Sequence, residues 1–135
     1  MSDKIHLKVI THEKIVFEDD IDEFYVQTTD GRLGILKNHI PVVCALGVGV
    51  TKVIKDKNSQ CIATMGGILQ FAHNKATILT DIAEVECDID VVRARQAKER
   101  AEARLKAQEE NQDMKRAQIA LMKALARLSA VEKKF

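Results

Sequence analysis

Residues 1–88 carry a repeated pattern of short apolar runs separated by polar turn residues. At the start, Ile5, Leu7 and Val9 alternate with His6 and Lys8, and this period of two places the apolar set on one face of a β-strand. Further runs rich in β-branched and aromatic residues follow at residues 15–17, 24–26, 33–36, 42–45, 48–54, 61–65, 68–71 and 77–80. Eight to ten short strands at this spacing predict a β-sandwich or a β-barrel.

Glycines and short polar segments mark the expected turns between these strands. Asp30-Gly31 is a strong hairpin signal, because glycine tolerates a positive φ. The polar segments 56–59 and 73–75 and the pair Gly66-Gly67 are also expected to form loops. Gly66-Gly67 and Gly47-Val48-Gly49 are too short for a dinucleotide-binding fingerprint, so we assign them a turn or bulge role. No helical pattern of about ten residues separates the strands, which excludes βαβ units.

The chain changes character after Asp88, because residues 89–135 contain neither Gly nor Pro. Asp88 is the expected N-cap of a first helix, and Asp90 adds negative charge to its first turn. A polar segment at 109–113 predicts a turn, after which an apolar stripe steps by three and four residues. The stripe consists of Met114, Ala117, Leu121, Ala124, Leu128 and Val131. We therefore predict an antiparallel two-helix hairpin that packs on the sandwich.

Alanines recur in the apolar seams of both helices, which predicts a weakly held hairpin. Each alanine buries little surface, and apolar burial stabilises by only about 25 cal/mol per Å². The hairpin is therefore expected to detach from the sandwich. Straightened into one helix, residues 89–135 would reach about 70 Å at a rise of 1.5 Å per residue.

Charge is distributed unevenly along this chain of net charge +1. Residues 1–88 hold 9 basic and 13 acidic side chains, a net −4, whereas residues 89–135 hold 12 and 7, a net +5. We place a domain boundary there, between residues 1–88 and 89–135. No apolar run approaches the roughly 18 residues that span a bilayer, and the charged start lacks the apolar core of a signal peptide. The three cysteines form no CxxC motif, which favours reduced thiols in a cytosolic compartment.

Few residues suggest catalysis. The four histidines are scattered without partners at metal-ligand spacing, so no metal site is expected. The sequence holds no P-loop, no nucleophile elbow and no Ser-His-Asp pattern that we can place. An independent enzyme is therefore disfavoured, and no required cofactor is indicated.

Basic side chains repeat along one side of each predicted helix. The first stripe is Arg93, Arg100 and Arg104, and the second is Arg116, Lys123, Arg127 and Lys134. One interpretation is a pair of solvated helix faces. The other is that two facing stripes bracket one polyanion, since guanidinium groups bind phosphate oxygens bidentately. Nucleic acid is a weaker choice, because the chain is nearly neutral and offers one Tyr and no Trp for base stacking.

Three segments give the chain a family resemblance. The first segment is Asp30-Gly31-Arg32-Leu33-Gly34-Ile35-Leu36-Lys37-Asn38-His39-Ile40-Pro41. It is similar to the loop G-x-L-G-I-L-P-x-H-x-P of the epsilon subunits of bacterial F-type ATP synthases, with Lys37 at the usual proline. Gly66-Gly67-Ile68-Leu69 resembles their G-G-F-hydrophobic hairpin. Ile89-Asp90-Val91-Val92-Arg93-Ala94 resembles their nucleotide motif, I/L-D-x-x-R-A. The resemblance covers the whole chain.

The resemblance implies a non-catalytic subunit of a rotary, proton-translocating ATP synthase. The sandwich would clamp the central-stalk gamma subunit and rest on the membrane c-ring, through Gly31, Arg32, Lys37, Asn38 and His39. The complex would lie peripherally on the cytoplasmic face of the bacterial plasma membrane. An extended hairpin would meet acidic loops of the catalytic alpha and beta subunits and block ATP hydrolysis.

The resemblance also implies an ATP-binding set in the folded hairpin. The matching positions are Glu84, Ile89, Asp90, Arg93, Ala94, Arg100 and Arg127, and Lys123 stands where nucleotide-binding relatives can have Arg. ATP would be an effector that offsets the mutual repulsion of Arg93, Arg100 and Arg127. Two other readings stay open: a free-standing nucleotide-binding module that uses the same arginines, and a nucleic-acid-binding arm.

Overall fold

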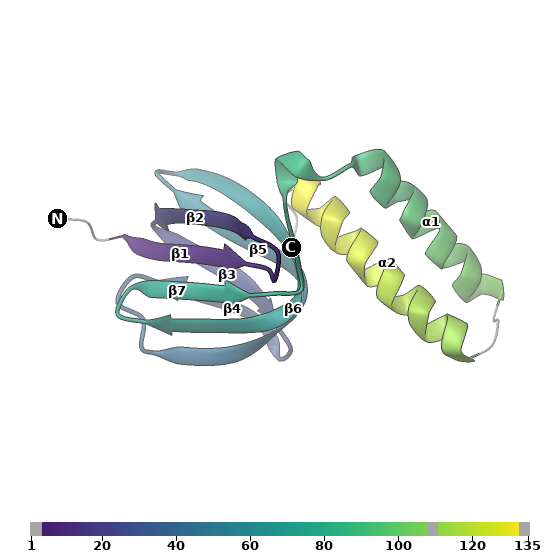
Figure 1. Ribbon diagram of the computed structural model, residues 1–135. Helices are drawn as coiled ribbons and strands as arrows, with labels where there is room; N and C mark the ends of the chain where they lie inside the picture. Colours follow the sequence, from purple (N-terminus) through teal and green to yellow (C-terminus); the bar gives the residue numbers. More distant parts are fainter. Residues whose placement is uncertain (1–3, 108–110, 133–135) are drawn as a thin grey trace.

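The computed structural model describes residues 4–107 and 111–132, and it contains a β-sandwich followed by two antiparallel helices (Figure 1). The strands are β1 (Ile5–Ile10), β2 (Ile15–Ile21), β3 (Glu23–Thr28), β4 (Gly31–Leu36), β5 (Val42–Lys55), β6 (Asn58–Ala72), β7 (Lys75–Leu79) and β8 (Ile82–Val85). A 3₁₀ turn, η1 (Glu86–Asp88), leads to α1 (Val91–Ala107) and α2 (Asn111–Glu132). The predicted fold class is confirmed, and the architecture is a sandwich.

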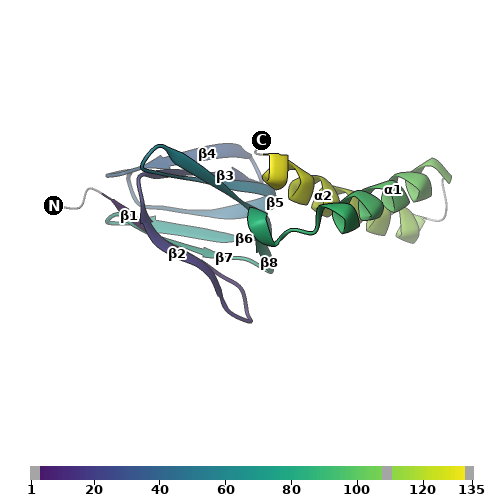
Figure 2. The same ribbon diagram turned by 90° about the horizontal axis from the view of Figure 1, so that it is seen from above.

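One continuous sheet folds over to make both layers of the sandwich. Its strand order is β2-β1-β7-β6-β5-β3-β4, with β8 also paired to β6. Seen from above, β3 and β4 lie on one side and β7 on the other, joined through the β5–β6 pair (Figure 2). The sheet is not wholly antiparallel as predicted, because β1 and β7 run parallel.

The central strands β5 and β6 are longer than predicted. The expected runs 42–45 and 48–54 merge into β5, and 61–65 and 68–71 merge into β6. Gly66-Gly67 is therefore not a hairpin loop, because pairing continues from Val48↔Met65 to Leu46↔Gly67. Gly67 has a φ of 113°, and a Cβ there would meet the carbonyl oxygen of Leu79 at 1.9 Å. Only glycine lets the strand bend at this point without losing its pairing.

The expected turns at Asp30-Gly31, at 56–59 and at 73–75 are confirmed, since each connects two neighbouring antiparallel strands. The short strand β8 was not predicted. It is only four residues long and has no clear alternation, and it is defined by its pairing with residues 62–65 of β6.

Large side chains fill the space between the layers. Phe24, Ile35 and Ile62 are among the fully buried residues of this core. In β6, residues 61–65 are buried without alternation, because one face of the strand points into the core and the other lies under α2. Two buried hydroxyls, those of Thr51 and Thr64, satisfy each other at 3.1 Å.

The helices are held by alanines on two faces of α2. The predicted stripe is confirmed: Ala117 and Ala124 are fully buried where α2 packs on α1. A second face, which includes Ala126 and Ala130, packs with Ile89 on the outer side of β5 and β6. The predicted turn at 109–113 was too long, because α2 already begins at Asn111. Among the described residues no helix is long and apolar enough to cross a membrane.

Candidate functional site

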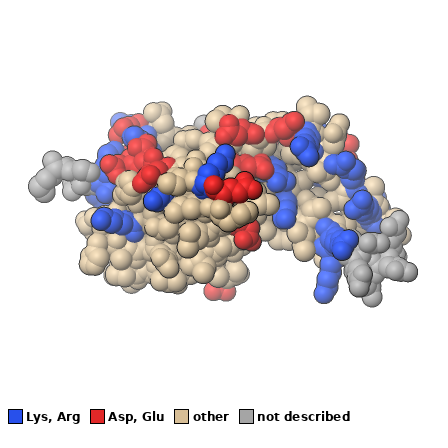
Figure 3. Space-filling view, in the orientation of Figure 1, with Lys and Arg blue, Asp and Glu red and all other residues tan. Residues whose placement is uncertain are grey.

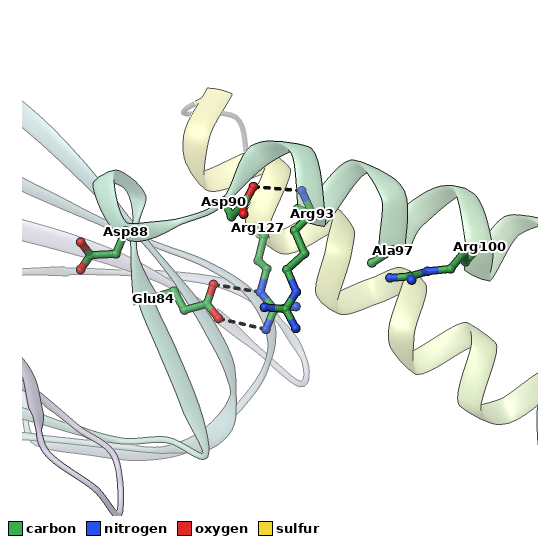
Figure 4. Close-up of a pocket in the computed structure, with 8 residues that line it drawn as sticks. Glu84, Asp88, Asp90, Arg93, Ala97, Arg100 and Arg127 are labelled. Atoms are coloured by element: carbon green, nitrogen blue, oxygen red, sulfur yellow. Dashed lines mark hydrogen bonds and ion pairs between the residues drawn. The ribbon is translucent and has the colours of Figure 1, made fainter.

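A cavity of about 490 Å³ lies where the hairpin meets the sandwich (Figure 4). Four elements supply its walls: β8, η1, α1 and α2. The lining residues are Glu84, Asp88, Asp90, Arg93, Ala94, Ala97, Arg100 and Arg127. The volume lies in the range that is usual for small-molecule sites, roughly 300–1,000 Å³.

A bidentate ion pair closes the sandwich side of the cavity. Arg127 donates from Nε to Oε2 of Glu84 at 2.9 Å and from Nη2 to Oε1 at 3.0 Å. The two side chains are about one quarter and one third exposed, so the pair is only partly screened by solvent. It joins α2 to β8. Glu84 therefore balances the charge of Arg127, which the sequence led us to expect as one of three mutually repelling arginines.

Asp90, and not Asp88, is the N-cap of α1. Its Oδ1 accepts the backbone N–H of Arg93 at 3.0 Å, and its carbonyl accepts the N–H of Ala94 at 2.9 Å. Asp88 lies too early, because the backbone is still extended at Ile89 before the helix begins. The Asp90 carboxylate thus satisfies a free helical N–H and adds negative charge where the helix dipole favours it.

Arg93 and Arg100 supply the cationic side of the cavity. In Figure 4 the Arg93 side chain runs from α1 toward the Arg127–Glu84 pair, and that of Arg100 extends along α1 toward Ala97. Within residues 4–107 and 111–132, no carboxylate lies within ion-pair distance of either guanidinium. Both groups are exposed and can bind an anion in the cavity through their planar donor sets.

The fold brings most of the sequence-predicted ATP set together. Six of its members line the cavity: Glu84, Asp90, Arg93, Ala94, Arg100 and Arg127. Ile89 is instead buried beneath α2, and Lys123 is not part of the lining. Asp88 and Ala97 were missed. Ala97 follows Arg93 by four residues and so shares its helix face, which is a signal the sequence did offer.

The residues expected at a partner interface do not form one loop. Gly31 and Arg32 begin β4, whereas residues 37–39 follow its opposite end. Arg32 lies near α2, where its Nη1 donates to the carbonyl of Val50 at 3.2 Å, and burial lowers its pKa. The family loop therefore comprises a strand and a short connection.

The Lys37–His39 connection packs against the β6–β7 turn at the end of the sandwich far from the helices. Asn38 accepts a hydrogen bond from Asn74 Nδ2 at 3.1 Å and donates its backbone N–H to Asn74 Oδ1 at 2.6 Å. The His39 ring lies edge-on to Phe71, with centroids 5.9 Å apart. These contacts give the connection a defined shape.

An exposed apolar row crosses the outer face of the sandwich, and the sequence did not reveal it. Strand register aligns five residues from β5 to β2, and three of them are about half exposed: Ile68, Leu79 and Ile15. The aligned positions are Ala45↔Ile68, Ile68↔Leu79, Leu79↔Ile10 and Ile10↔Ile15. The row could not be predicted, because it depends on the register of five strands, one pair of which is parallel. Below we call these residues the apolar row.

Charges are unevenly spread over the face shown in Figure 3. The hairpin side is mostly basic, whereas the sandwich and the junction carry most of the acidic side chains, with some basic ones among them (Figure 3). Among the described residues no cluster of three or more His, Cys, Asp or Glu side chains is placed to hold a metal ion.

Comparisons with known proteins agree over nearly the whole chain. Residues 4–86 match the family model of the ATP synthase delta/epsilon chain β-sandwich domain, and residues 88–132 match that of its long α-helix domain. The ATP synthase epsilon chain of Halalkalibacterium halodurans is 45% identical over 92% of this chain and 94% of its own. That of Pediococcus pentosaceus is 42% identical over 91% of both chains.

Solved structures share the fold. A chain in the Euglena gracilis mitochondrial ATP synthase, in an assembly of OSCP, F1 and c-ring, superposes with a TM-score of 0.81 at 21% identity. The superposition covers 96% of this chain and 81% of the Euglena chain. A chain in the central stalk and c-ring of the Tetrahymena thermophila mitochondrial enzyme gives 0.60 at 15% identity, covering 95% and 96%.

Proposed function

Because the chain belongs to the delta/epsilon family of ATP synthase chains, and specifically matches epsilon chains, we propose that it is a nucleotide-sensing regulator of the central stalk. ATP in the cavity holds the hairpin against the sandwich. Without ATP the hairpin detaches, extends and blocks ATP hydrolysis by the catalytic subunits. The observation that carries this proposal is the cavity itself, since its walls come from both helices and from β8.

The charges of the cavity suit a phosphate ligand. Arg93 and Arg100 on α1 have no carboxylate partner among the described residues, while Arg127 on α2 is held by Glu84. A ligand shifts a conformational equilibrium only through its different affinity for the two states. Extension of the hairpin would separate α1 from α2 and from β8, so a phosphate bound among them favours the folded form. ATP acts here as an effector, and the chain needs no cofactor.

The hairpin is built to separate. Its apolar contact with the sandwich is made by Ala126, Ala130 and Val131, which offer little surface to the strands, and α1 adds almost no contact of its own. The Arg127–Glu84 ion pair is the polar contact between α2 and β8. Extended, the arm of net charge +5 would reach about 70 Å at 1.5 Å per residue. Positive charge over that length suits the acidic loops of the alpha and beta subunits.

The sandwich supplies the docking surfaces. In the described part of the chain the apolar row is an exposed strip, and we assign it to the gamma subunit of the central stalk. The far end, with Lys37, Asn38 and His39, faces the c-ring. In this arrangement the chain is a peripheral, non-catalytic part of a proton-translocating enzyme on the cytoplasmic face of the bacterial plasma membrane.

Isothermal titration of the isolated chain tests the nucleotide site. Arg93→Ala removes a charge-assisted phosphate contact of about 1.5–3 kcal/mol, so ATP affinity should fall about tenfold or more. Arg104→Ala is the matched control, because Arg104 is exposed on α1 and does not line the cavity. Lys123→Arg should also leave the affinity unchanged. Absence of heat with millimolar ATP, or equal affinities in all four proteins, would refute the site.

Cys61 offers a native probe of hairpin release. It is fully buried beneath α2, whereas Cys87 is exposed in η1 and serves as an internal reference. In a Cys44→Ser background, ATP should slow alkylation of Cys61 relative to Cys87 several-fold, and Arg93→Ala should abolish this protection. If Cys61 reacts at the same rate with and without ATP, the nucleotide does not hold the hairpin down.

A pull-down separates the stalk subunit from a free-standing nucleotide-binding module. The chain should capture the gamma subunit from solubilised membranes, and Leu79→Asp in the apolar row should lose it. Thr77→Asp lies two residues away on the same strand face and is the control for adding a charge. A chain that binds ATP but captures no stalk subunit would favour the free-standing module.

A further inference from the structure

His6 lies between two carboxylates on the outer face of the sandwich. Its Nδ1 is 2.8 Å from Oδ1 of Asp20, and its Nε2 is 2.9 Å from Oε2 of Glu18. Neutral imidazole carries one N–H, so it can donate to only one of these oxygens. Only the imidazolium ion can donate to both oxygens, and in the described part of the chain His6 is the one histidine with a carboxylate at each ring nitrogen.

The contact joins an edge strand to the sheet. His6 is on β1 and faces Asp20 directly across the pair, while Glu18 is its diagonal neighbour on β2. β2 ends the strand order, so β1 is its only paired neighbour among the described strands. The β1–β2 register also shifts between Val9 and Ile10, which interrupts the backbone ladder. Side-chain contacts therefore matter more for β2 than for a central strand.

The charges around His6 favour its protonated form. The carboxylates of Asp20 and Glu18 raise the pKa of His6 through hydrogen bonds, Asp20 having the larger effect. Three lysines lie on neighbouring positions: Lys75 faces His6 across the β1–β7 pair, Lys8 is two residues further on β1, and Lys4 two residues before it. Lys4 is itself paired with Asp22 and Asp56, and Asp19 with Lys55.

The same hairpin carries part of the apolar row. Positions 6, 8 and 10 of β1 share the outer face, so His6 and Ile10 lie on one surface. Ile15 of the row is on β2. An edge strand that loosens will therefore disturb the end of the row.

We propose that His6 is a pH-sensitive lock on the β1–β2 edge, which keeps the docking face of the sandwich intact when it is protonated and weakens docking when it is not. The docking part rests on the proposed stalk function. His6 binds its proton more tightly in the folded chain than in the unfolded chain, because its folded pKa is raised. The stabilisation that protonated His6 gives is therefore complete below the pKa of an unfolded histidine, about 6.5, and it is lost as the pH rises through the higher folded pKa.

The lock is tested first on the isolated full chain. Histidine ring NMR from pH 5 to 9 should give His6 a pKa above the ordinary histidine value of about 6.5. His12, which is exposed and 3.7 Å from a single carboxylate, is the control position for substitution. Amide exchange of residues 17–20, corrected for intrinsic rates, should speed up roughly two- to fivefold across that titration. His6→Gln and Asp20→Asn should each remove this pH step, whereas His12→Gln should keep it. A step that survives in both variants, or a pKa for His6 that is not above the ordinary histidine value, overturns the lock.

The docking consequence is tested with the purified gamma subunit. Its dissociation constant should rise by a similar factor over the same pH range with the wild-type chain and with His12→Gln, and stay flat with His6→Gln. A pH profile unchanged by His6→Gln overturns the docking role. No binding at any pH refutes the stalk function instead, and the NMR and exchange results on the isolated chain still decide the lock.

Discussion

The two parts of the molecule are held together by different kinds of side chains. The sandwich core consists largely of Phe, Ile, Leu and Val residues, many with no exposed surface. The hairpin relies on alanines, both between its helices and against the sandwich. Since burial stabilises in proportion to apolar area, the first interface is strong and the second weak. The alanine interfaces therefore stabilise the hairpin less than the large core residues stabilise the sandwich.

The largest expected effect contrasts these two interiors. Phe24→Ala should lower the free energy of unfolding by about 3–5 kcal/mol, because it empties a fully buried aromatic site. Ala124→Gly, at an equally buried position in the hairpin, should cost about 1 kcal/mol. Urea denaturation monitored by circular dichroism measures both. Equal losses would contradict the contrast.

The bend in β6 gives the next effect. Gly67→Ala should cost about 2–3 kcal/mol, because the new Cβ would collide with the backbone of Leu79 and Thr80. Gly31 also has a positive φ, of 131°, but nothing lies within 4 Å of a Cβ there. Gly31→Ala should therefore cost only about 1 kcal/mol, the price of the backbone conformation alone. Thermal denaturation of both variants distinguishes the destabilisation caused by the steric clash at residue 67 from that caused by a positive φ alone at residue 31.

A truncated chain tests whether the scaffold is independent. A fragment ending at Asp88 keeps every strand and the core, so it should fold. It should lose about 1–2 kcal/mol, because Val50, Ala63 and Met65 become exposed when α2 is gone. Circular dichroism and urea denaturation give the answer. An unfolded fragment would show that the weak interface is essential after all.

The smallest effect is a response to acid at the surface of the sandwich. Hydrogen bonds from Lys55 and Lys4 lower the pKa of Asp19 and Asp22. Their contribution is present above the unfolded value of 3.8 and is lost as the pH falls through the lower folded values. Asp19→Asn should therefore flatten the loss of thermal stability between pH 4 and 2, because it slightly lowers the stability at pH 7 and leaves the value at pH 2 nearly unchanged. An identical acid profile would count against this ion pair.

Local patterns in the sequence predicted the sandwich, the hairpin and most turns, because alternation and turn chemistry depend on neighbouring residues. Other features depend on contacts between distant segments. Residues 61–65 are buried on both faces only because α2 covers one of them, and Gly66-Gly67 stays within a strand because β5 runs alongside.

In the candidate site, too, the features that depend on neighbouring residues were predictable and those that depend on distant segments were not. The helical spacing of Arg93 and Arg100 predicted that they share one helix face. No local pattern indicated that Glu84 would form an ion pair with Arg127, which lies 43 residues further along the chain. The predicted N-cap was Asp88, but the observed N-cap is Asp90, because the chain makes a 3₁₀ turn at residues 86–88 and is extended at Ile89 before the helix begins. Cap position is thus set by the path from the sandwich into the helix, which composition alone does not describe.

The parallel pairing of β1 with β7 also has a consequence for synthesis on the ribosome. Leu7 lies beside Ala76, so almost the whole sandwich must be translated before β1 finds its second neighbour. At roughly 5–20 residues per second, the first hairpin waits for several seconds with an unpaired inner edge. Long-range closure of this kind is intrinsically slow, and an unpaired apolar strand is a template for aggregation. Nascent chains should therefore be most vulnerable to misassembly just before β7 emerges.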